Sequence, residues 1–160
     1  METWKEKPFR MRYPTTELKR LQWRVKDIED IPPGFTREPI HSAQDLMKYW
    51  FLFKDMPSER FVVFVLNTAN RIVSVDIVSE GTMNASLVHP REVFRAAVMG
   101  LGAAIIVAHN HPSGNIEPSS EDCSITRQIT EAGKILGIPV HDHIIFGDNG
   151  YTSFAERGLL

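Results

Sequence analysis

A continuous apolar run, residues 103–108, lies between two segments, 90–101 and 119–136, whose apolar residues recur at helical spacing. A short run of this kind is typical of a strand that is buried on both faces. A further predicted strand, residues 140–146, follows the longer helical segment. This alternation of helices and buried strands predicts an α/β domain, built in layers.

The ends of the two predicted helices carry specific signals. Pro90 suits the first position of a helix, which extends to about Leu101. The longer helix begins at Ser119 or Ser120 and stops before Gly137, because glycine is the usual residue just past a helix end. The inner side of the first helix is predicted to carry Val93, Phe94, Ala97 and Val98.

Two further elements precede this pattern. Residues 61–66 and 72–78 are rich in β-branched and aromatic side chains and are separated by a short polar turn, so they predict a hairpin. Ser42 is placed to cap a helix before the hairpin. The inner side of that helix is predicted to carry Leu46, Tyr49, Trp50 and Phe53.

Length and composition favour one domain. The chain has 160 residues, 42% of them hydrophobic, which is enough for one core and too short for two. The break Ile-Pro-Pro-Gly at 31–34 leads us to expect a basic extension, residues 1–40, before a domain at 41–160. We expect a cytoplasmic protein without a membrane span, because no long apolar stretch is present. The single cysteine, Cys123, excludes an internal disulfide and is predicted to be buried.

Positive charge is concentrated at the start of the chain. Residues 1–26 hold eight Lys or Arg and three acidic residues, a net charge of +5, so the remainder carries −7 to reach the total of −2. Aromatic residues lie among these cations, a mixture that suits nucleic-acid binding. The favoured interpretation is a half-buried strand at 21–26, because apolar and polar residues alternate there.

Two histidines follow the most apolar strand. His109 and His111 are two residues apart and therefore lie on one side of the chain, where both imidazoles can reach one zinc ion. Asp122, in the first turn of the next helix, is the predicted third ligand. Three ligands leave a fourth position for water, whose pKa a catalytic zinc lowers to about 7.

Each residue of this set also has a structural interpretation. Asp122 lies three residues after Ser119, which matches a helix cap, and a single histidine at a strand end is commonly structural. His141 and His143 share the two-residue spacing, but their apolar neighbours favour a structural or orienting role. His41 and His89 lie near helix starts and are expected to be structural. The combined spacing favours the metal site.

The residues carry a family resemblance. His109-x-His111, seven residues, Ser119, two residues and Asp122 resemble the JAMM motif of JAB/MPN metalloproteases, and residues 85–94 with 109–115 resemble the RadC-like branch. The resemblance covers about residues 40–156. It implies a mixed sheet flanked by helices, in the JAB/MPN (cytidine-deaminase-like) architecture. It also implies zinc on the two histidines and the aspartate, Ser119 helping to hold an oxyanion, and an upstream glutamate as general base.

Two glutamates are candidates for the general base. Glu59 begins the first hairpin strand, and Glu80 follows the second. Glu59 is favoured because it matches the family position, at the start of an early core strand. A base must come within about 2.6–3.2 Å of the proton it removes.

The resulting hypothesis is a zinc-dependent peptidase or isopeptidase that attacks an amide of a protein or peptide substrate with activated water. One alternative is a DNA-associated phosphodiesterase or DNA-repair-related protein that uses the basic segment to bind nucleic acid. Another is a non-catalytic binding module on the same fold. A zinc deaminase is disfavoured, because its cysteine signature is missing.

Overall fold

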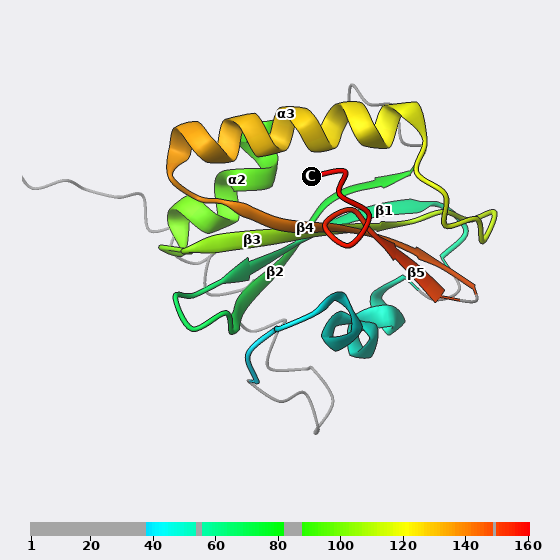
Figure 1. Cartoon of the computed structure of the whole chain (residues 1–160), viewed down its shortest axis with the longest axis horizontal. Helices are drawn as coiled ribbons and strands as arrows, with labels where there is room; N and C mark the ends of the chain where they lie inside the picture. Colours follow the sequence, from blue (N-terminus) through cyan, green and yellow to red (C-terminus); the bar gives the residue numbers. More distant parts are fainter. Residues whose placement is uncertain (1–37, 54–55, 82–87, 149) are drawn as a thin grey trace, which may run out of the picture. The chain divides into compact units, whose positions relative to one another are not determined.

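The computed structural model describes residues 38–53, 56–81, 88–148 and 150–160, which form a mixed sheet (Figure 1). The sheet has the strand order β2-β1-β3-β4-β5. β3 and β4 are parallel, and the other neighbouring pairs are antiparallel. The strands are β1 (Glu59–Leu66), β2 (Ile72–Gly81), β3 (Ala104–Asn110), β4 (Val140–Gly147) and β5 (Gly150–Ser153).

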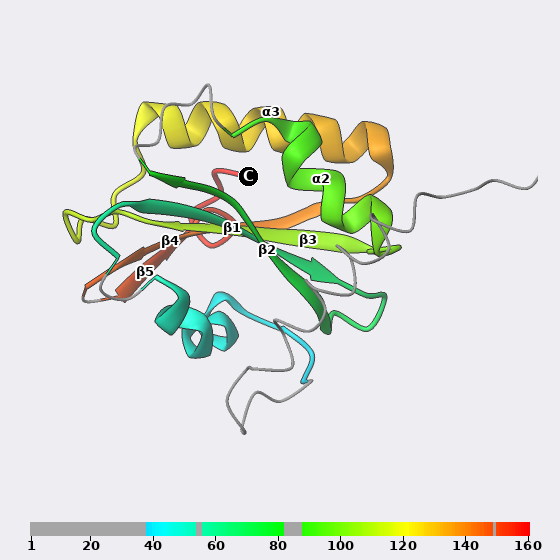
Figure 2. The ribbon, with the colours of Figure 1, turned by 180° about the vertical axis from the view of Figure 1, so that it is seen from behind.

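Helices cover both faces of the sheet. α2 (Pro90–Met99) and α3 (Ser120–Leu136) lie on one face, and η1 (Ala43–Leu52) lies on the other, as the opposite views in Figures 1 and 2 show. Because side chains alternate along a strand, β1 supplies Phe61 to the α2–α3 side and Val62 to the η1 side. This architecture confirms the predicted α/β fold with a mixed sheet flanked by helices.

The cap signals located the helix ends closely. Ser119 is the N-cap of α3, and Gly137 ends it in the left-handed conformation, with φ of 69°. Pro90 begins α2, which ends at Met99. The prediction for Val98 was wrong: this residue is 54% exposed, because it lies about 100° around the helix from the buried Ala97 and so falls outside the face that packs on the sheet.

The segment after Ser42 is helical as predicted, but it is a 3-10 helix. Leu46, Tyr49 and Phe53 are buried beneath it, whereas Trp50 is only half-buried. The hairpin of β1 and β2 is confirmed, with β1 beginning at Glu59.

The C-terminal edge of the sheet was not fully predicted. β5 pairs with β4 through the turn at 147–150, and the sequence analysis did not identify this four-residue strand. The predicted strand at 21–26 and most of the basic extension lie outside the described residues, so the domain boundary stays a prediction. Within the described part of the chain, no helix is long and apolar enough to cross a membrane.

Candidate metal centre

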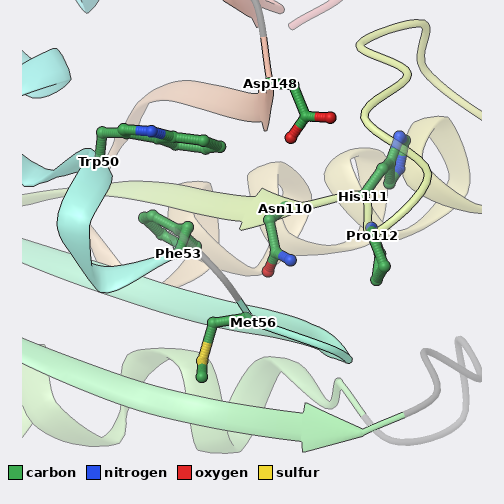
Figure 3. Close-up of a pocket in the computed structure, with 7 residues that line it drawn as sticks. All are labelled: Trp50, Phe53, Met56, Asn110, His111, Pro112 and Asp148. Carbon is green, nitrogen blue, oxygen red and sulfur yellow. The ribbon is translucent and has the colours of Figure 1, made fainter.

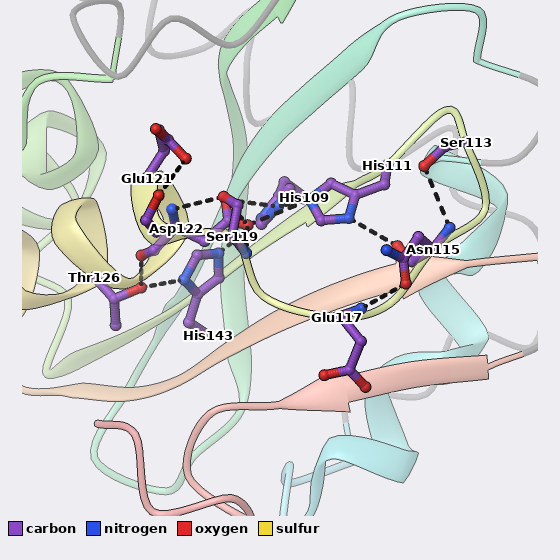
Figure 4. Close-up of polar contacts among 11 residues, drawn as sticks. His109, His111, Ser113, Asn115, Glu117, Ser119, Glu121, Asp122, Thr126 and His143 are labelled. Atoms are coloured by element: carbon purple, nitrogen blue, oxygen red, sulfur yellow. Dashed lines mark hydrogen bonds and ion pairs between the residues drawn. The ribbon is translucent and has the colours of Figure 1, made fainter.

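The predicted ligands lie where β3 ends. Asn110 is the last residue of β3, and His111 follows it at the edge of a pocket (Figure 3). His109 is opposite Phe61 in the antiparallel pair β1–β3, so its side chain faces α3. Asp122, in the first turn of α3, contacts His109 from the helix (Figure 4).

The three side chains converge at the distances that one metal ion requires. Nε2 of His109 lies 3.1 Å from Oδ1 of Asp122, and Nε2 of His111 lies 3.3 Å from Oδ2. The two Nε2 atoms are 3.0 Å apart. Ligands bound tetrahedrally to zinc at 2.0–2.1 Å are separated by about 3.3 Å. These three residues therefore form a candidate metal-binding group.

Asp122 is a helix cap as well as a candidate ligand. The Ser119 hydroxyl accepts a hydrogen bond from the Asp122 backbone N–H at 3.0 Å and donates to Oδ2 of Asp122 at 2.7 Å. The Ser119 backbone N–H also donates to Oδ2, at 2.8 Å. The two interpretations of this residue are thus compatible, because the cap holds one carboxylate oxygen and leaves Oδ1 facing His109.

A buried hydrogen-bond chain fixes the tautomer of His109 (Figure 4). The Thr126 hydroxyl donates to the backbone carbonyl of Asp122, because a carbonyl only accepts, and it therefore accepts from Nδ1–H of His143. Nε2 of His143 is then unprotonated and accepts from Nδ1–H of His109, at 2.8 Å. Nε2 of His109 is left with a lone pair that points toward Asp122 and His111.

The tautomer of His111 is fixed from the loop. Its Nδ1–H donates to the backbone carbonyl of Asn115 at 2.7 Å, so its Nε2 carries a lone pair when the ring is neutral. Two imidazole lone pairs and a carboxylate then face one another within 3.3 Å. The three groups repel one another unless a proton or a metal cation lies between them, and two imidazole nitrogens with a carboxylate are a donor set that fits a divalent metal.

The ionisation of the three groups is coupled. Burial alone would raise the pKa of Asp122, but the contacts with His109 and His111 outweigh burial and hold it well below its usual range. The hydrogen bond with Asp122 raises the pKa of His111. Complete burial lowers the pKa of His143 well below its usual value, so this ring is neutral.

The sheet register separates the two candidate bases. Glu59 has the same orientation as Phe61, two residues along β1, and therefore faces the side of the sheet that carries His109. Glu80 is paired directly with Arg60 and binds its guanidinium at 3.0 Å on the η1 side. Glu59 is near enough to His111 for its charge to contribute to the raised pKa of that ring. The geometry favours Glu59, whose role as base stays a prediction.

Asn110 was not predicted to have a role, although it stands between the two histidines. Its side chain is buried and faces the η1 side, where Oδ1 accepts from the Arg60 backbone N–H at 2.8 Å. Its Nδ2 donates to the Ser58 backbone carbonyl at 3.2 Å. Asn110 thus holds the peptide groups on both sides of Glu59.

The other singled-out residues lie outside the cluster. His141 is exposed, and His89 caps α2 by accepting from the Arg91 backbone N–H. His41 is exposed, and its backbone N–H donates to Asp45. Cys123 is half-buried rather than buried.

Residues 40–159 match the RadC-like JAB domain. The chain belongs to this family. The match covers both helices of the α2–α3 layer, the whole described sheet and every residue of the candidate centre.

Relatives of the RadC-like chain carry family names only. A UPF0758 protein of Symbiobacterium thermophilum is 56% identical over 102 residues, which are 64% of this chain and 44% of the relative. One from Geobacter sulfurreducens is 52% identical over 70% of this chain and 49% of the relative. A third, from Methanosarcina mazei, is 42% identical over 79% of this chain and 57% of the relative. The matched region spans about half of each relative.

Proposed function

We propose that this RadC-like domain is a zinc-dependent hydrolase that cleaves amide bonds in proteins or peptides. The observation that supports it best is the convergence of His109, His111 and Asp122 with their lone pairs toward one point. His109 and Asp122 are buried, whereas the His111 side chain is 13% exposed. Access to the centre is therefore from the His111 side.

The donor set suits a catalytic ion. Zinc bound by two histidines and one carboxylate would supply Lewis acidity and lower the pKa of a coordinated water toward neutrality. Other side chains of the protein orient the candidate ligands. Thr126 and His143 orient the His109 ring, and Ser119 orients the Asp122 carboxylate.

Glu59 is the proposed general base. In this role its carboxylate takes a proton from the attacking water and returns it to the leaving amine. Ser119 is proposed to assist by donating its hydroxyl to the oxyanion. That donation requires the hydroxyl to rotate away from Asp122, to which it is bonded at 2.7 Å.

An amide is a better substrate for this centre than a phosphodiester. Phosphoryl-transfer sites balance phosphate charge with metal ions and, commonly, with Arg or Lys. The described residues at and beside the centre include Glu59 and Asp148, and the cation on β1, Arg60, is engaged by Glu80. This negative surrounding disfavours a phosphate backbone. Binding of nucleic acid would depend on the basic segment at 1–26.

The test combines metal analysis with hydrolysis of a peptide mixture. We expect about one zinc per chain, cleavage by the zinc-loaded protein, loss of cleavage on chelation, and recovery when zinc is restored. Glu59→Gln should retain zinc and lose cleavage, while the matched control Glu80→Gln should retain both. Zinc binding without cleavage of any protein or peptide would contradict the proposal and favour a binding module.

A further inference from the structure

A pocket borders the candidate centre on the η1 side of the sheet (Figure 3). Its volume is about 260 Å³, and His111 belongs both to its wall and to the metal cluster. A group bound in the pocket therefore lies next to the bond that the centre would cleave. The pocket is lined by Trp50, Phe53, Met56, Asn110, His111, Pro112 and Asp148.

One wall of the pocket is apolar and aromatic. Trp50 is half-buried, and its ring packs against Phe146 with a centroid separation of 5.5 Å. Phe53 is buried and packs against the same ring at 4.8 Å. Met56 adds a half-buried thioether side chain. These contacts hold the wall in place, and it suits an alkyl chain or a cation that lies against an aromatic ring.

The opposite wall carries a negative charge. Asp148 is exposed, and among the residues that the structure describes none forms a hydrogen bond or an ion pair with its carboxylate. None of the lining residues named above is Lys or Arg. The carboxylate lies against Gly114, since a Cβ at that glycine would be only 2.6 Å from Oδ2 of Asp148. The loop at 111–115, which begins with His111, therefore lies beside the carboxylate of Asp148.

The loop at 111–115 and the β4–β5 turn approach each other closely. A Cβ at Gly147 would lie 2.5 Å from the backbone carbonyl of Gly114. The backbone N–H of His111 donates to the carbonyl of Phe146 at 3.3 Å. Asp148 is thus held near the loop by backbone contacts of the two residues that precede it.

We infer that this pocket binds the basic side chain, lysine or arginine, of a peptide substrate beside the scissile amide. The alkyl stem lies along Trp50 and Met56, and the cation meets Asp148. An acidic or phosphorylated side chain is repelled by the same carboxylate. The inference rests on the proposed function, because it assigns the pocket to the substrate of that centre.

The test is equilibrium binding of short fluorescent peptides to the zinc-loaded full chain. The peptides are otherwise alike and carry Lys, Arg, norleucine or Glu at one scanned position. We expect Lys and Arg to bind about fivefold more tightly than norleucine, because an exposed ion pair and a cation–π contact are each modest. Added salt should reduce this preference. Mass spectrometry of the same samples scores cleavage separately.

Variants of Asp148 decide the assignment. Asp148→Asn should reduce the preference for Lys over norleucine, and Asp148→Lys should make Glu the preferred residue. Glu131→Gln, which removes an exposed acid on α3, is the matched control and should bind as the wild type does. Equal binding of all peptides, or a lysine preference that survives Asp148→Lys, overturns the inference. Cleavage without a preference for basic residues would overturn this inference and leave the proposed function standing. A preference for basic residues without cleavage would support the pocket assignment and contradict the proposed function.

Discussion

Thr126 Oγ1 lies 2.5 Å from Nδ1 of His143, and this contact determines which nitrogen of His109 is free to bind a cation. The hydroxyl has one proton, which it donates in a hydrogen bond to the backbone carbonyl of Asp122. His143 must therefore keep its proton on Nδ1 and accept from His109. A residue on α3 thus controls a candidate ligand on β3 through a residue on β4.

Thr126→Val should weaken metal binding about tenfold, within the range seen when a partner of a ligating histidine is removed. Without the hydroxyl, His143 is free to place its proton on Nε2 and drive the His109 proton to the wrong nitrogen. The measurement is competition against a chelator of known zinc affinity. Thr126→Ser keeps the hydroxyl and serves as the control, and equal zinc affinity of the Val and Ser variants would contradict the relay.

Ser119→Ala separates capping from catalysis. Loss of the N-cap side chain should lower the free energy of unfolding of the metal-free protein by about 1 kcal/mol. If Ser119 also helps to hold the oxyanion, kcat should fall by a further factor of roughly 100 at unchanged zinc content. Urea unfolding and peptide turnover measure the two effects. A fall in stability with unchanged kcat would restrict Ser119 to the cap.

Asn110→Asp tests whether the two hydrogen bonds from the Asn110 side chain to the backbone of β1 and Ser58 position Glu59. The carboxylate keeps the acceptor for the Arg60 N–H but loses the donor to the Ser58 carbonyl, so an acceptor then faces an acceptor. We expect a loss of about 1–3 kcal/mol in stability and a lower kcat with zinc content retained. Asn110→Ala removes both bonds without this repulsion. Wild-type kcat in both folded variants would exclude a positioning role.

The buried carboxyl of Asp142 should make stability depend on pH. Burial raises its pKa, although Ser153 and the backbone N–H groups of His143 and Ala155 donate to it. The folded state therefore holds this proton more tightly than the unfolded state, whose pKa is near 3.8. As pH falls from neutral through the raised pKa, the wild type should gain stability relative to Asp142→Asn.

This gain should level off below the pKa of the unfolded state. Denaturant unfolding of both proteins at a series of pH values measures the difference in free energy. A difference that does not change with pH would mean that Asp142 titrates alike in the folded and unfolded states.

The sequence predicted those parts of the centre that follow from local spacing. His109 and His111 are two residues apart in an extended chain, so their side chains were expected on the same side. The capping residues of α3 mark its first turn, so the position of Asp122 could also be predicted without knowledge of the tertiary structure. The choice between Glu59 and Glu80 needed the β1–β2 register, which decides the face on which each side chain lies.

Other features depended on contacts that spacing does not encode. The side chain of Asn110 forms hydrogen bonds with backbone groups that lie 50 and 52 positions away in the chain. β5 is short and largely polar, and it is a strand only because β4 offers it an edge. The 3-10 geometry of η1 likewise escaped prediction, because the spacing of its apolar residues suits either helix type.

The Asp122 carboxylate serves the start of α3 with one oxygen and faces His109 with the other. A chain that has not yet formed this turn lacks its third ligand, and an ion held there would resist fraying of the helix. Metal binding at this group would therefore be coupled to the order of one helical turn, and amide hydrogen exchange at residues 119–123 should slow when zinc is added.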